Sequence, residues 1–540
     1  MKKVFTAMLS ATVILSIVLT GCATTKKTAP TKKEQVLNLT ETDEIPTMDL
    51  TKATDAIAFR VMINTMEGLY RLDKDNKPIP GIAEAYTASP DKKTYTFKLR
   101  DAKWSNGDPV TANDFVYAWR RLVDPKSASE YAYIMYYVKN GQKVNEGKLP
   151  LDSLGIKALD DKTLVVDLEA PMPEATFIAL TTFPSYFPLN EKYIASQGEK
   201  FGLEANTTLF NGPFTLSNWK HNESFQFKKN DTYWDAKTVR LQTINFNIVK
   251  NVSSAVNLYE SGQIDQVSLS SEFVDKYKNK PEFKTVPEAS IFFLRMNEKN
   301  PTLKNKNVRK AIDLAVDKQA LTSAILNNGS QPAYFFVPKN FVKSPDGKDF
   351  REINGDFNKT DTKKAKDLWT TAKKELGQDK VTLELLNFDS ETSKKVGEYL
   401  KDQLEKNLDG LTITIKQQPF KQKLDLVSKL DYQISLDGWG ADYLDAVSYL
   451  DVFVTNGTNN NTTYSNPAYD KLISDAKTTL ASDDKARFNA LLSAEKILFD
   501  DAVISPIYQR GSAVITKSYV KNVYHHLVGG DYSYKWAYVE

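Results

Sequence analysis

The sequence predicts a mixed α/β protein whose second half contains a parallel sheet. Apolar residues recur along the chain at intervals of two, typical of half-buried strands, and at intervals of about 3.6, typical of helices. Between residues 381 and 437 the two patterns follow one another as strand, helix, strand, helix, strand. That order requires parallel strands joined by right-handed crossovers. The 540 residues, of which 41% are hydrophobic, can form roughly two to four domains.

The most regular elements lie in this 381–437 region. Strands are expected at 381–385, 411–415 and 432–436, with a helix between the first two that ends at Gly410. Ligands of such sheets bind just past the carboxyl ends of the strands. The segment GWGADY, residues 438–443, lies at one of these ends.

The first half of the chain gives further strands and one well-marked helix. Strands are predicted at 95–99, 164–168 and 244–248, and a helix after the last of them ends at Gly262. The pair Thr111 and Asp114 resembles a capping box that starts a helix. This helix buries one apolar face and ends at Asp124-Pro125; the face carries Phe115, Ala118, Trp119 and Leu122.

Farther along, residues 307–329 have a helical pattern that Gly329 stops. The apolar positions of this pattern are Val308, Ala311, Ile312, Ala315, Leu321, Ala324 and Ile325. No internal repeat is evident, which disfavours solenoids and propellers.

The N-terminus has the layout of an export signal. Lys2 and Lys3 precede an uncharged, mostly apolar run that closes on Leu19-Thr20-Gly21-Cys22. This end resembles the lipobox of bacterial lipoproteins, in which the cysteine carries a diacylglyceryl group and becomes the new N-terminus. We therefore expect a signal peptide over 1–21, lipidation of Cys22 and a flexible tether over 22–35. The alternative is an ordinary secretory signal that happens to contain a cysteine.

Composition excludes several classes of protein. The formal net charge is +3, and basic and acidic side chains are interleaved, so a nucleic-acid partner is not expected. Cys22 is the only cysteine, which rules out an internal disulfide.

Catalytic and metal-binding motifs are not found. The sequence has three histidines and no HExxH, GxSxG or Walker A motif, and the calcium-like segment at 72–77 lacks its glycine and distal glutamate. The adjacent His525 and His526 are expected to be packed or at the surface, because side chains of neighbouring extended residues point apart. These observations predict a protein that is not an enzyme and holds no metal or cofactor.

Several segments together resemble one family, the extracellular solute-binding proteins of peptide ABC transporters, specifically the oligopeptide-binding lipoproteins of family 5. The resemblance spans nearly the whole chain after Cys22. It rests on WSNGDPVTANDFVYAWRRLVDP (104–125), NGPFTLSNWKHNESFQFKKNDTYWD (211–235), NLYESGQID (257–265), KNVRKAIDLAVDK (306–318), GWGADY and the closing YSYKWAYVE.

This resemblance implies a two-lobed α/β fold of the periplasmic-binding-protein type II, with an additional inserted domain. Two strands would form the hinge between the lobes, and ligand would be trapped between them. The first lobe would comprise 36–66, 190–292 and 510–540, the inserted domain 67–189 and the second lobe 293–509.

The family also implies the site. Relatives bind an extended peptide through main-chain hydrogen bonds and grip its free α-amino group with an aspartate, which matches Asp442 of GWGADY. From the residues alone, Asp442 could equally be a turn-forming aspartate. Trp439 would wall the cleft, and Gly438 and Gly440 would let the main chain approach the ligand because they carry no Cβ. Relatives often have a cysteine at the position of Gly440.

Two further segments are assigned by the same resemblance. Tyr131 matches a tyrosine of the inserted domain that borders the peptide, with Tyr133 as the alternative. The extended stretch Thr54, Asp55 and Ala56 matches the segment that offers main-chain groups to the ligand. Relatives commonly have an arginine before the Gly-Trp pair, whereas this chain has Leu436 and Asp437, so the charge preference and preferred peptide length stay open.

The function implied is a monomeric receptor, anchored by lipid to the outer face of the cell membrane, that delivers oligopeptides to an ABC permease. One alternative is the same fold binding another solute, such as a dipeptide, a signalling peptide, a sugar or a metal chelate. A second alternative, from a different class, is a lipoprotein hydrolase or an adhesin.

Overall fold

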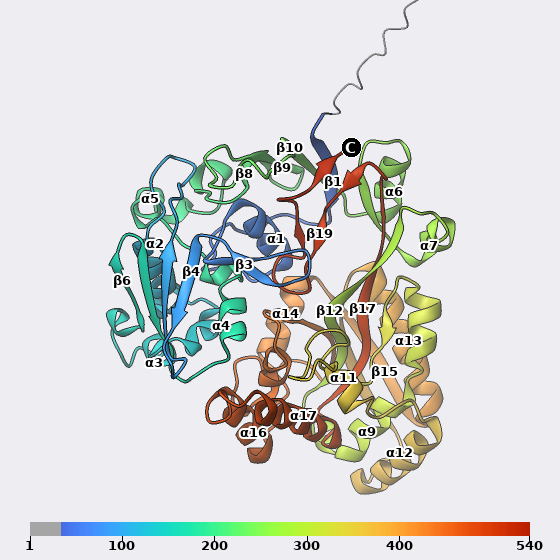
Figure 1. Cartoon of the computed structure of the whole chain (residues 1–540). Helices are drawn as coiled ribbons and strands as arrows, with labels where there is room; N and C mark the ends of the chain where they lie inside the picture. The colour runs from blue at the N-terminus through green and yellow to red at the C-terminus, as the bar shows by residue number, and fades with distance from the viewer. Residues whose placement is uncertain (1–33) are drawn as a thin grey trace, which may run out of the picture. The chain divides into compact units, whose positions relative to one another are not determined.

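The computed structural model describes residues 34–540, so the predicted signal peptide and Cys22 lie outside the described residues. Residues 35–540 form one compact unit by their contacts. The division of this unit into two lobes and an inserted domain therefore stays a prediction. Helices and strands are interspersed along the chain, which confirms the mixed α/β class (Figure 1).

Two four-stranded sheets are built from the first half of the chain. One has the order β1-β10-β9-β8, with β1 parallel to β10, and the other has the order β4-β5-β7-β6. The strands of the first are β1 (Val36–Glu41), β8 (Phe214–Lys220), β9 (Ser224–Lys229) and β10 (Thr243–Ile248). Those of the second are β4 (Ala83–Ala88), β5 (Thr94–Leu99), β6 (Ile156–Asp160) and β7 (Thr163–Asp167). The strands predicted at 95–99, 164–168 and 244–248 are thus confirmed, although β7 ends one residue early.

The largest sheet has the order β11-β17-β12-β16-β14-β15. Its strands are β11 (Gln266–Leu269), β12 (Phe283–Met296), β14 (Val381–Phe388), β15 (Leu411–Gln418), β16 (Ile434–Gly440) and β17 (Ile504–Thr516). β14 runs parallel to both β15 and β16, and α13 (Glu391–Asn407) and α14 (Phe420–Ser428) connect these strands. The predicted strand and helix order of 381–437 is therefore confirmed.

The long strands β12 and β17 run side by side through this sheet (Figure 1). They pair from Phe283 opposite Ile515 to Arg295 opposite Ile504, with a register shift between Pro287 and Ile291. The predicted boundaries between the first and second lobes, at 292/293 and 509/510, both lie in this ladder, where Ile291 pairs with Gln509. An irregular two-stranded ladder is a suitable place for bending, because a bulge interrupts the regular hydrogen bonds.

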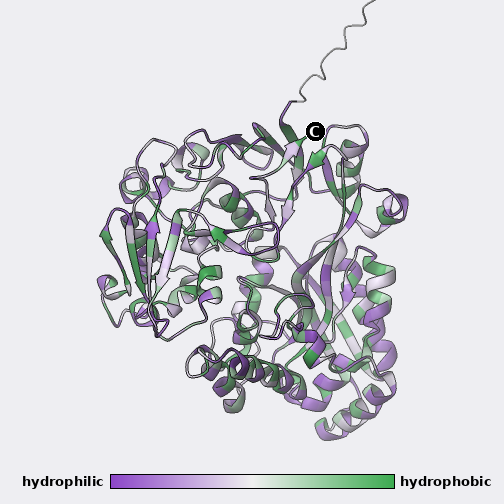
Figure 2. Ribbon diagram, in the orientation of Figure 1, coloured by the Kyte–Doolittle hydropathy of each residue, from purple (hydrophilic) through white to green (hydrophobic). Residues whose placement is uncertain are grey.

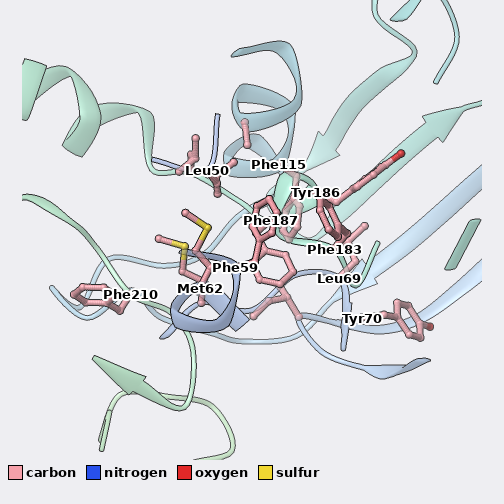
Figure 3. Close-up of a cluster of buried hydrophobic side chains, with 14 of the residues drawn as sticks. Leu50, Phe59, Met62, Leu69, Tyr70, Phe115, Phe183, Tyr186, Phe187 and Phe210 are labelled. Carbon is pink, nitrogen blue, oxygen red and sulfur yellow. The ribbon is translucent and has the colours of Figure 1, made fainter. Parts of the chain in front are cut away.

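One apolar core joins α1 (Ala56–Thr65) to elements of the 67–189 region (Figure 3). Phe59 of this helix packs edge-on against Phe183, with ring centroids 4.9 Å apart, and Met62 and Phe187 belong to the same cluster. Burying a side chain of this size stabilises a fold by roughly 1.5–3 kcal/mol. The predicted inserted domain and first lobe therefore share a continuous core.

The helix predicted after Thr111 is α2 (Ala112–Val123). The main-chain N–H of Thr111 donates to Asp114 at 2.8 Å, so the capping box is confirmed. The predicted apolar face is buried, with Phe115 and Trp119 both 0% exposed, and the helix ends at Asp124 as expected.

The helix expected over 307–329 is wrong as a continuous element. The chain forms α9 (Lys306–Ala315), breaks at Val316, and continues as the short α10 (Lys318–Ala320) and a π-helical turn over Leu321–Leu326. Lys318 is buried and its Nζ lies 2.9 Å from Asp313, which also accepts a hydrogen bond from Ser505. Asp317 caps α10, so polar contacts outweigh the helical periodicity at this point.

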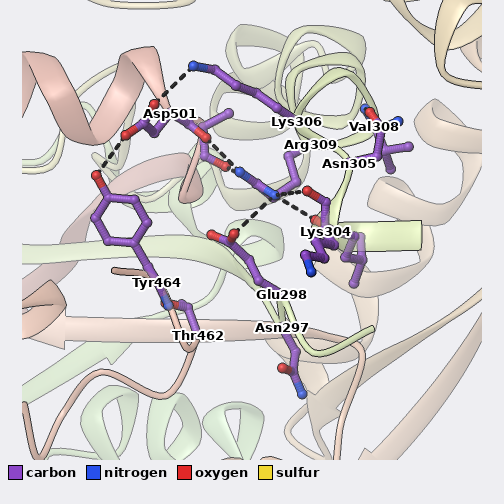
Figure 4. A network of polar contacts seen from close by, with 12 residues as sticks. Asn297, Glu298, Lys304, Asn305, Lys306, Val308, Arg309, Thr462, Tyr464 and Asp501 are labelled. Carbon is purple, nitrogen blue, oxygen red and sulfur yellow. Dashed lines mark hydrogen bonds and ion pairs between the residues drawn. The ribbon is translucent and has the colours of Figure 1, made fainter. Parts of the chain in front are cut away.

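Arg309 in α9 is held by main-chain carbonyls and one carboxylate (Figure 4). Its guanidinium donates to the main-chain carbonyls of Leu303, Lys304, Asp501 and Ala502. It also lies 3.3 Å from Glu298. Arg309 therefore ties the start of α9 to the end of α17 (Asp484–Asp500).

The outer helices of the second half are amphipathic (Figure 2). In α12 (Thr362–Leu376) the buried residues are Ala365, Trp369 and Ala372, while lysines occupy much of the remaining surface. None of the helices within 34–540 combines the length and the apolar character needed to span a bilayer.

Of the remaining helices and short strands, β13 (Gln331–Pro332) joins the largest sheet by pairing with β17, and α16 (Pro467–Lys477) contributes Tyr469 and Ile473 to a buried core. The other helices are α3 (Gly141–Asn145), α4 (Glu174–Leu180), α5 (Glu191–Gln197), α6 (Val252–Glu260), α7 (Ser271–Tyr277), α8 (Pro301–Lys304), α11 (Phe350–Asn354) and α15 (Val447–Leu450). The other short strands are β2 (Tyr70–Leu72), β3 (Pro78–Pro80), β18 (Val520–Lys521), β19 (Tyr524–His525), β20 (Tyr532–Ser533) and β21 (Tyr538–Val539).

Candidate functional site

Near the end of β16, the main-chain groups along one edge of the strand point away from the neighbouring strands. Its ladder with β12 continues to Gly440, but its ladder with β14 pairs only Ile434 and Ser435. Residues of an antiparallel strand direct their main-chain groups alternately to the two sides. Since the N–H of Ala441 donates to Ala289 on the β12 side, Gly438 and Gly440 direct theirs to the opposite side.

Gly438 and Gly440 are both exposed, although they belong to a strand inside the sheet order. A Cβ on Gly438 would lie 3.0 Å from the Phe292 ring, so this ring would have to shift slightly to admit a larger residue. The indole N–H of Trp439 donates to the carbonyl of Ser448 at 2.8 Å, which holds this side chain half-buried beside the edge.

Asp442 lies two residues beyond the end of β16 and is only 9% exposed. Its main-chain N–H donates to the hydroxyl of Ser448 at 3.0 Å. Its carboxylate accepts hydrogen bonds from the hydroxyls of Tyr131 at 3.2 Å and Tyr133 at 2.7 Å. The structure thus brings Asp442 together with both tyrosines named from the sequence.

Among residues 34–540, no cationic side chain is paired with the carboxylate of Asp442. Burial raises the pKa of the Asp442 carboxyl from 3.8 to about 6, and the hydrogen bonds from Tyr133 and Tyr131 offset part of that increase. Burial also raises the pKa of both tyrosines well above 10, so they remain donors at neutral pH. A desolvated carboxylate without a counter-ion is an unfavourable arrangement that a cationic ligand group would relieve.

The tyrosines come from a short helical segment of the 67–189 region. Tyr131 is the N-cap of a 3-10 helix over Ala132–Tyr137, and its ring stacks on Phe183 with centroids 5.5 Å apart. A third tyrosine of this segment, Tyr137, shares a 2.7 Å hydrogen bond with Tyr443, the neighbour of Asp442. Sequence reasoning missed this pair. Four tyrosines within residues 131–137 were the available signal.

Thr54, Asp55 and Ala56 lie at the start of α1. Thr54 and Ala56 are exposed, and Asp55 caps the helix by accepting from the N–H groups of Ile57 and Ala58. Asp55 has an extended backbone, but Ala56 is already helical, so the expected extended stretch is one residue shorter than predicted. The carboxylate of Asp55 is close enough to raise the pKa of Tyr131, after the larger effects of burial and Asp442.

Asp437, directly before the Gly-Trp pair, does not add a negative charge to the site. Its carboxylate is 5% exposed and is paired with Arg295 and Lys423. The hydroxyl of Ser435 donates to it as well, at 2.8 Å. The charge of Asp437 is therefore compensated inside the protein.

A small pocket of about 20 Å³ adjoins Asp442. Most of its wall is apolar, and its polar lining residues besides Asp442 are Glu67, Arg71, Thr182 and His526. It is lined by Ile63, Met66, Glu67, Arg71, Leu72, Thr182, Phe183, Phe187, Asp442, His526, Val528, Gly529 and Gly530. These residues come from all three predicted parts of the chain. The pocket is large enough for about one water molecule.

Within residues 34–540, no group of three or more His, Cys, Asp or Glu side chains is arranged to hold a metal ion. The site therefore consists of a strand edge, a buried carboxylate with two hydroxyl donors, and a small adjoining pocket. Such a set can bind an extended backbone and an ammonium group.

Comparison with known proteins gives consistent matches. Residues 77–461 match the family described as bacterial extracellular solute-binding proteins, family 5 Middle. The dipeptide-binding protein DppE of Bacillus subtilis is 35% identical over 97% of this chain and 97% of its own.

Two solved structures are similar over 94% of this chain and 99% of their own. One is the substrate-binding domain of an oligopeptide ABC transporter from Bacillus anthracis, at 52% identity and a TM-score of 0.88. The other is Listeria monocytogenes OppA bound to peptide, at 44% identity and a TM-score of 0.86.

Proposed function

Because the chain belongs to the bacterial extracellular solute-binding proteins of family 5, we propose that it binds oligopeptides and delivers them to an ABC permease for import. Members of this family are binding proteins and not enzymes, in line with the missing catalytic motifs. The observation that carries the proposal is the uncompensated carboxylate of Asp442 at the end of an open strand edge.

Asp442 is the group that fixes the register of the peptide. A free α-amino group is an ammonium ion at neutral pH, and it can replace the two tyrosine hydroxyls or share the carboxylate with them. Because the carboxylate is already desolvated, the ion pair forms without the full cost of removing water from Asp442. The exchange favours peptides with a free N-terminus over blocked ones.

The open edge of β16 supplies affinity that does not depend on sequence. Every peptide residue offers the same N–H and C=O groups, so pairing with Gly438 and Gly440 accepts many side chains. Thr54, Asp55 and Ala56 are proposed to approach the peptide from its other side, as the resemblance to relatives implies. Trp439 limits the width of the cleft.

Closure around the peptide would bend the chain at β12 and β17. The register shift between Pro287 and Ile291 lies directly beside the site, since Ala289 accepts hydrogen bonds from Ala441 and from the hydroxyl of Tyr449. Ala289 therefore connects the proposed peptide site with the strand segment that would bend. Hinge closure around ligand is a common mechanism of two-lobed receptors.

The proposed location is the outer face of the cell membrane, with the monomeric receptor held by lipid on Cys22. A tether keeps the receptor near its permease and raises the local concentration without a fixed contact. A Cys22→Ala protein should bind peptide normally in solution yet fail to support peptide uptake by cells. Uptake that persists at low expression would show that the tether is dispensable.

The central experiment compares one peptide with a free N-terminus and the same peptide N-acetylated, by isothermal titration calorimetry. Asp442→Ala should weaken the free peptide far more than the acetylated one. Asp431→Asn, at an exposed aspartate of the same region, serves as the control and should leave both affinities unchanged. Equal loss for both peptides in Asp442→Ala would refute the assignment.

A second candidate ligand is a dipeptide, because a relative that is 35% identical over 97% of this chain carries that name. Native mass spectrometry of protein purified from cells distinguishes the candidates. A ladder of peptide masses supports oligopeptides, and a narrow range near dipeptide mass supports the second candidate. A single non-peptide mass would point to another solute, such as a sugar or a metal chelate.

A further inference from the structure

Tyr443, the residue that follows Asp442, is buried in an apolar core that other parts of the chain build. This core includes α1 and much of the 67–189 region. Within residues 34–540, Tyr443 is the one buried member of the core that comes from the predicted second lobe, 293–509, and it is 5% exposed. Because an aromatic ring buries a large apolar area, Tyr443 ties the two parts of the chain together.

The hydroxyl of Tyr443 makes a second connection between these parts. It shares a 2.7 Å hydrogen bond with the hydroxyl of Tyr137, and the two rings meet edge to face with centroids 6.3 Å apart. Nζ of Lys477, also in 293–509, lies 5.6 Å from the centroid of the Tyr137 ring and 2.9 Å from Asp451. Burial raises the pKa of both tyrosine hydroxyls, so both stay protonated at neutral pH. The Tyr137–Tyr443 pair therefore joins the 67–189 region to 293–509.

Close to this pair the two regions are joined less tightly. Thr176 donates to the carboxylate of Asp445 at 3.3 Å, and Asp445 is also paired with Arg487 at 2.9 Å. A cavity of about 300 Å³ adjoins this contact, lined by Pro173 and Thr176 from 67–189 and by residues such as Phe341 and Arg487 from 293–509. The two regions therefore do not pack together continuously along this boundary.

We propose that Tyr443 holds the cleft closed over a bound peptide and thereby slows release of the peptide. This inference rests on the proposed function, in which the 67–189 region and 293–509 move apart when the cleft opens. Opening must withdraw the Tyr443 ring from the core and break its hydrogen bond to Tyr137. The hydroxyls of Tyr131 and Tyr133 give up Asp442 to the ligand, whereas the Tyr137–Tyr443 pair uses no group that the peptide needs. This pair therefore persists when peptide is bound, whatever the peptide sequence.

The test measures the dissociation rate of a peptide that has a free N-terminus and a fluorescent label at its C-terminus, by stopped-flow displacement with excess unlabelled peptide. Tyr443→Ala should release the peptide roughly 10- to 100-fold faster, because it removes the buried ring. Tyr443→Phe and Tyr137→Phe should each release it about fivefold faster, because each leaves one buried hydroxyl unpaired. Association rates should stay nearly unchanged.

Two comparisons separate closure from general damage. The double variant with both Tyr137→Phe and Tyr443→Phe should release peptide no faster than either single variant, because it leaves no hydroxyl unpaired. Tyr399→Phe is the matched control, because it removes a 2.8 Å hydrogen bond to Asp317 that lies wholly within 293–509, and it should release peptide at the wild-type rate.

The affinity ratio between the free and the N-acetylated peptide should stay unchanged in Tyr443→Phe, because Asp442 is intact. If Tyr443→Ala does not fold, the phenylalanine variants decide. Wild-type release rates in both single phenylalanine variants, additive acceleration in the double variant, equal acceleration in Tyr399→Phe, or a lost preference for the free N-terminus would each overturn the inference and leave the proposed function intact. A wild-type protein that binds no peptide would instead refute the proposed function.

Discussion

Replacing Asp442 by asparagine should stabilise the unliganded protein while weakening its affinity for peptides. The pKa of the carboxyl rises from 3.8 to about 6 on folding, mainly through burial. Each pKa unit corresponds to 1.36 kcal/mol, so the buried charge destabilises the empty protein by about 3 kcal/mol at neutral pH. Asparagine removes that charge but satisfies the hydroxyls of Tyr131 and Tyr133 less well, at a cost of about 1 kcal/mol. The expected net gain in the free energy of unfolding is about 1–2 kcal/mol.

The sign of the pH dependence gives a second check. A carboxyl whose pKa is raised in the folded state destabilises that state when it is ionised. The penalty is therefore full above about pH 6 and is relieved as the pH falls toward 3.8. The advantage of Asp442→Asn over the wild type should be largest near pH 7.5 and should vanish near pH 4. Taking the difference between the two proteins removes the titration of all other groups that are unaffected by the substitution.

The assay is chemical unfolding of both proteins at several pH values, paired with calorimetric titration of a peptide with a free N-terminus. The loss of a charge-assisted hydrogen bond should weaken peptide binding roughly 10- to 150-fold, from about 1.5–3 kcal/mol. A less stable Asp442→Asn protein at pH 7.5 would contradict the view that Asp442 is an uncompensated charge. Unchanged peptide affinity would contradict its role as the amino-group ligand.

Three further outcomes follow from particular contacts. Peptide affinity of the wild type should fall by up to about tenfold per pH unit below about pH 6, because protonated Asp442 cannot pair with an ammonium group; a flat titration profile from pH 7 to 5 would speak against this. Glu495→Ala should lower the free energy of unfolding by about 3–5 kcal/mol, because Glu495 is 0% exposed and its loss leaves the buried Arg351 without its carboxylate partner. Asp75→Ala, which removes an exposed pair with Lys74, should change the free energy of unfolding far less, and similar losses in both would contradict the reasoning. Gly530→Ala should destabilise the protein and weaken peptide binding together, because the added Cβ would meet the carbonyl of Phe59 at 2.5 Å; a variant with normal unfolding and binding would show that the loop can move at little cost.

The helices and strands of the chain could be predicted from the sequence only in part. The alternation of β14, α13 and β15 followed from periodicity, because each element buries one face against the same sheet. The helical pattern of apolar residues gave a wrong prediction at Val316, where α9 ends. There the buried ion pair between Lys318 and Asp313 accompanies the break in the helix. Apolar spacing carries no information about a polar contact of this kind.

What the sequence determined by itself was local: the helix that starts at Thr111, the strands of the 381–437 region, and the position of Asp442 just beyond a strand end. These features depend on neighbouring residues, whose capping groups and side-chain periodicity act over a few ångströms. Only the tertiary structure decided that β14 diverges from β16 and leaves Gly438 and Gly440 open.

The tertiary structure also decided which groups surround the carboxylate of Asp442. Tyr131 and Tyr133 donate to it from positions 311 and 309 residues away, and His526 lines the pocket beside it from near the C-terminus. Contacts at such separations depend on how the sheets and their shared core bring distant segments together. No local pattern of charge or hydrophobicity specifies that path, so the sequence could name Asp442 but could not show that its charge is buried and unpaired.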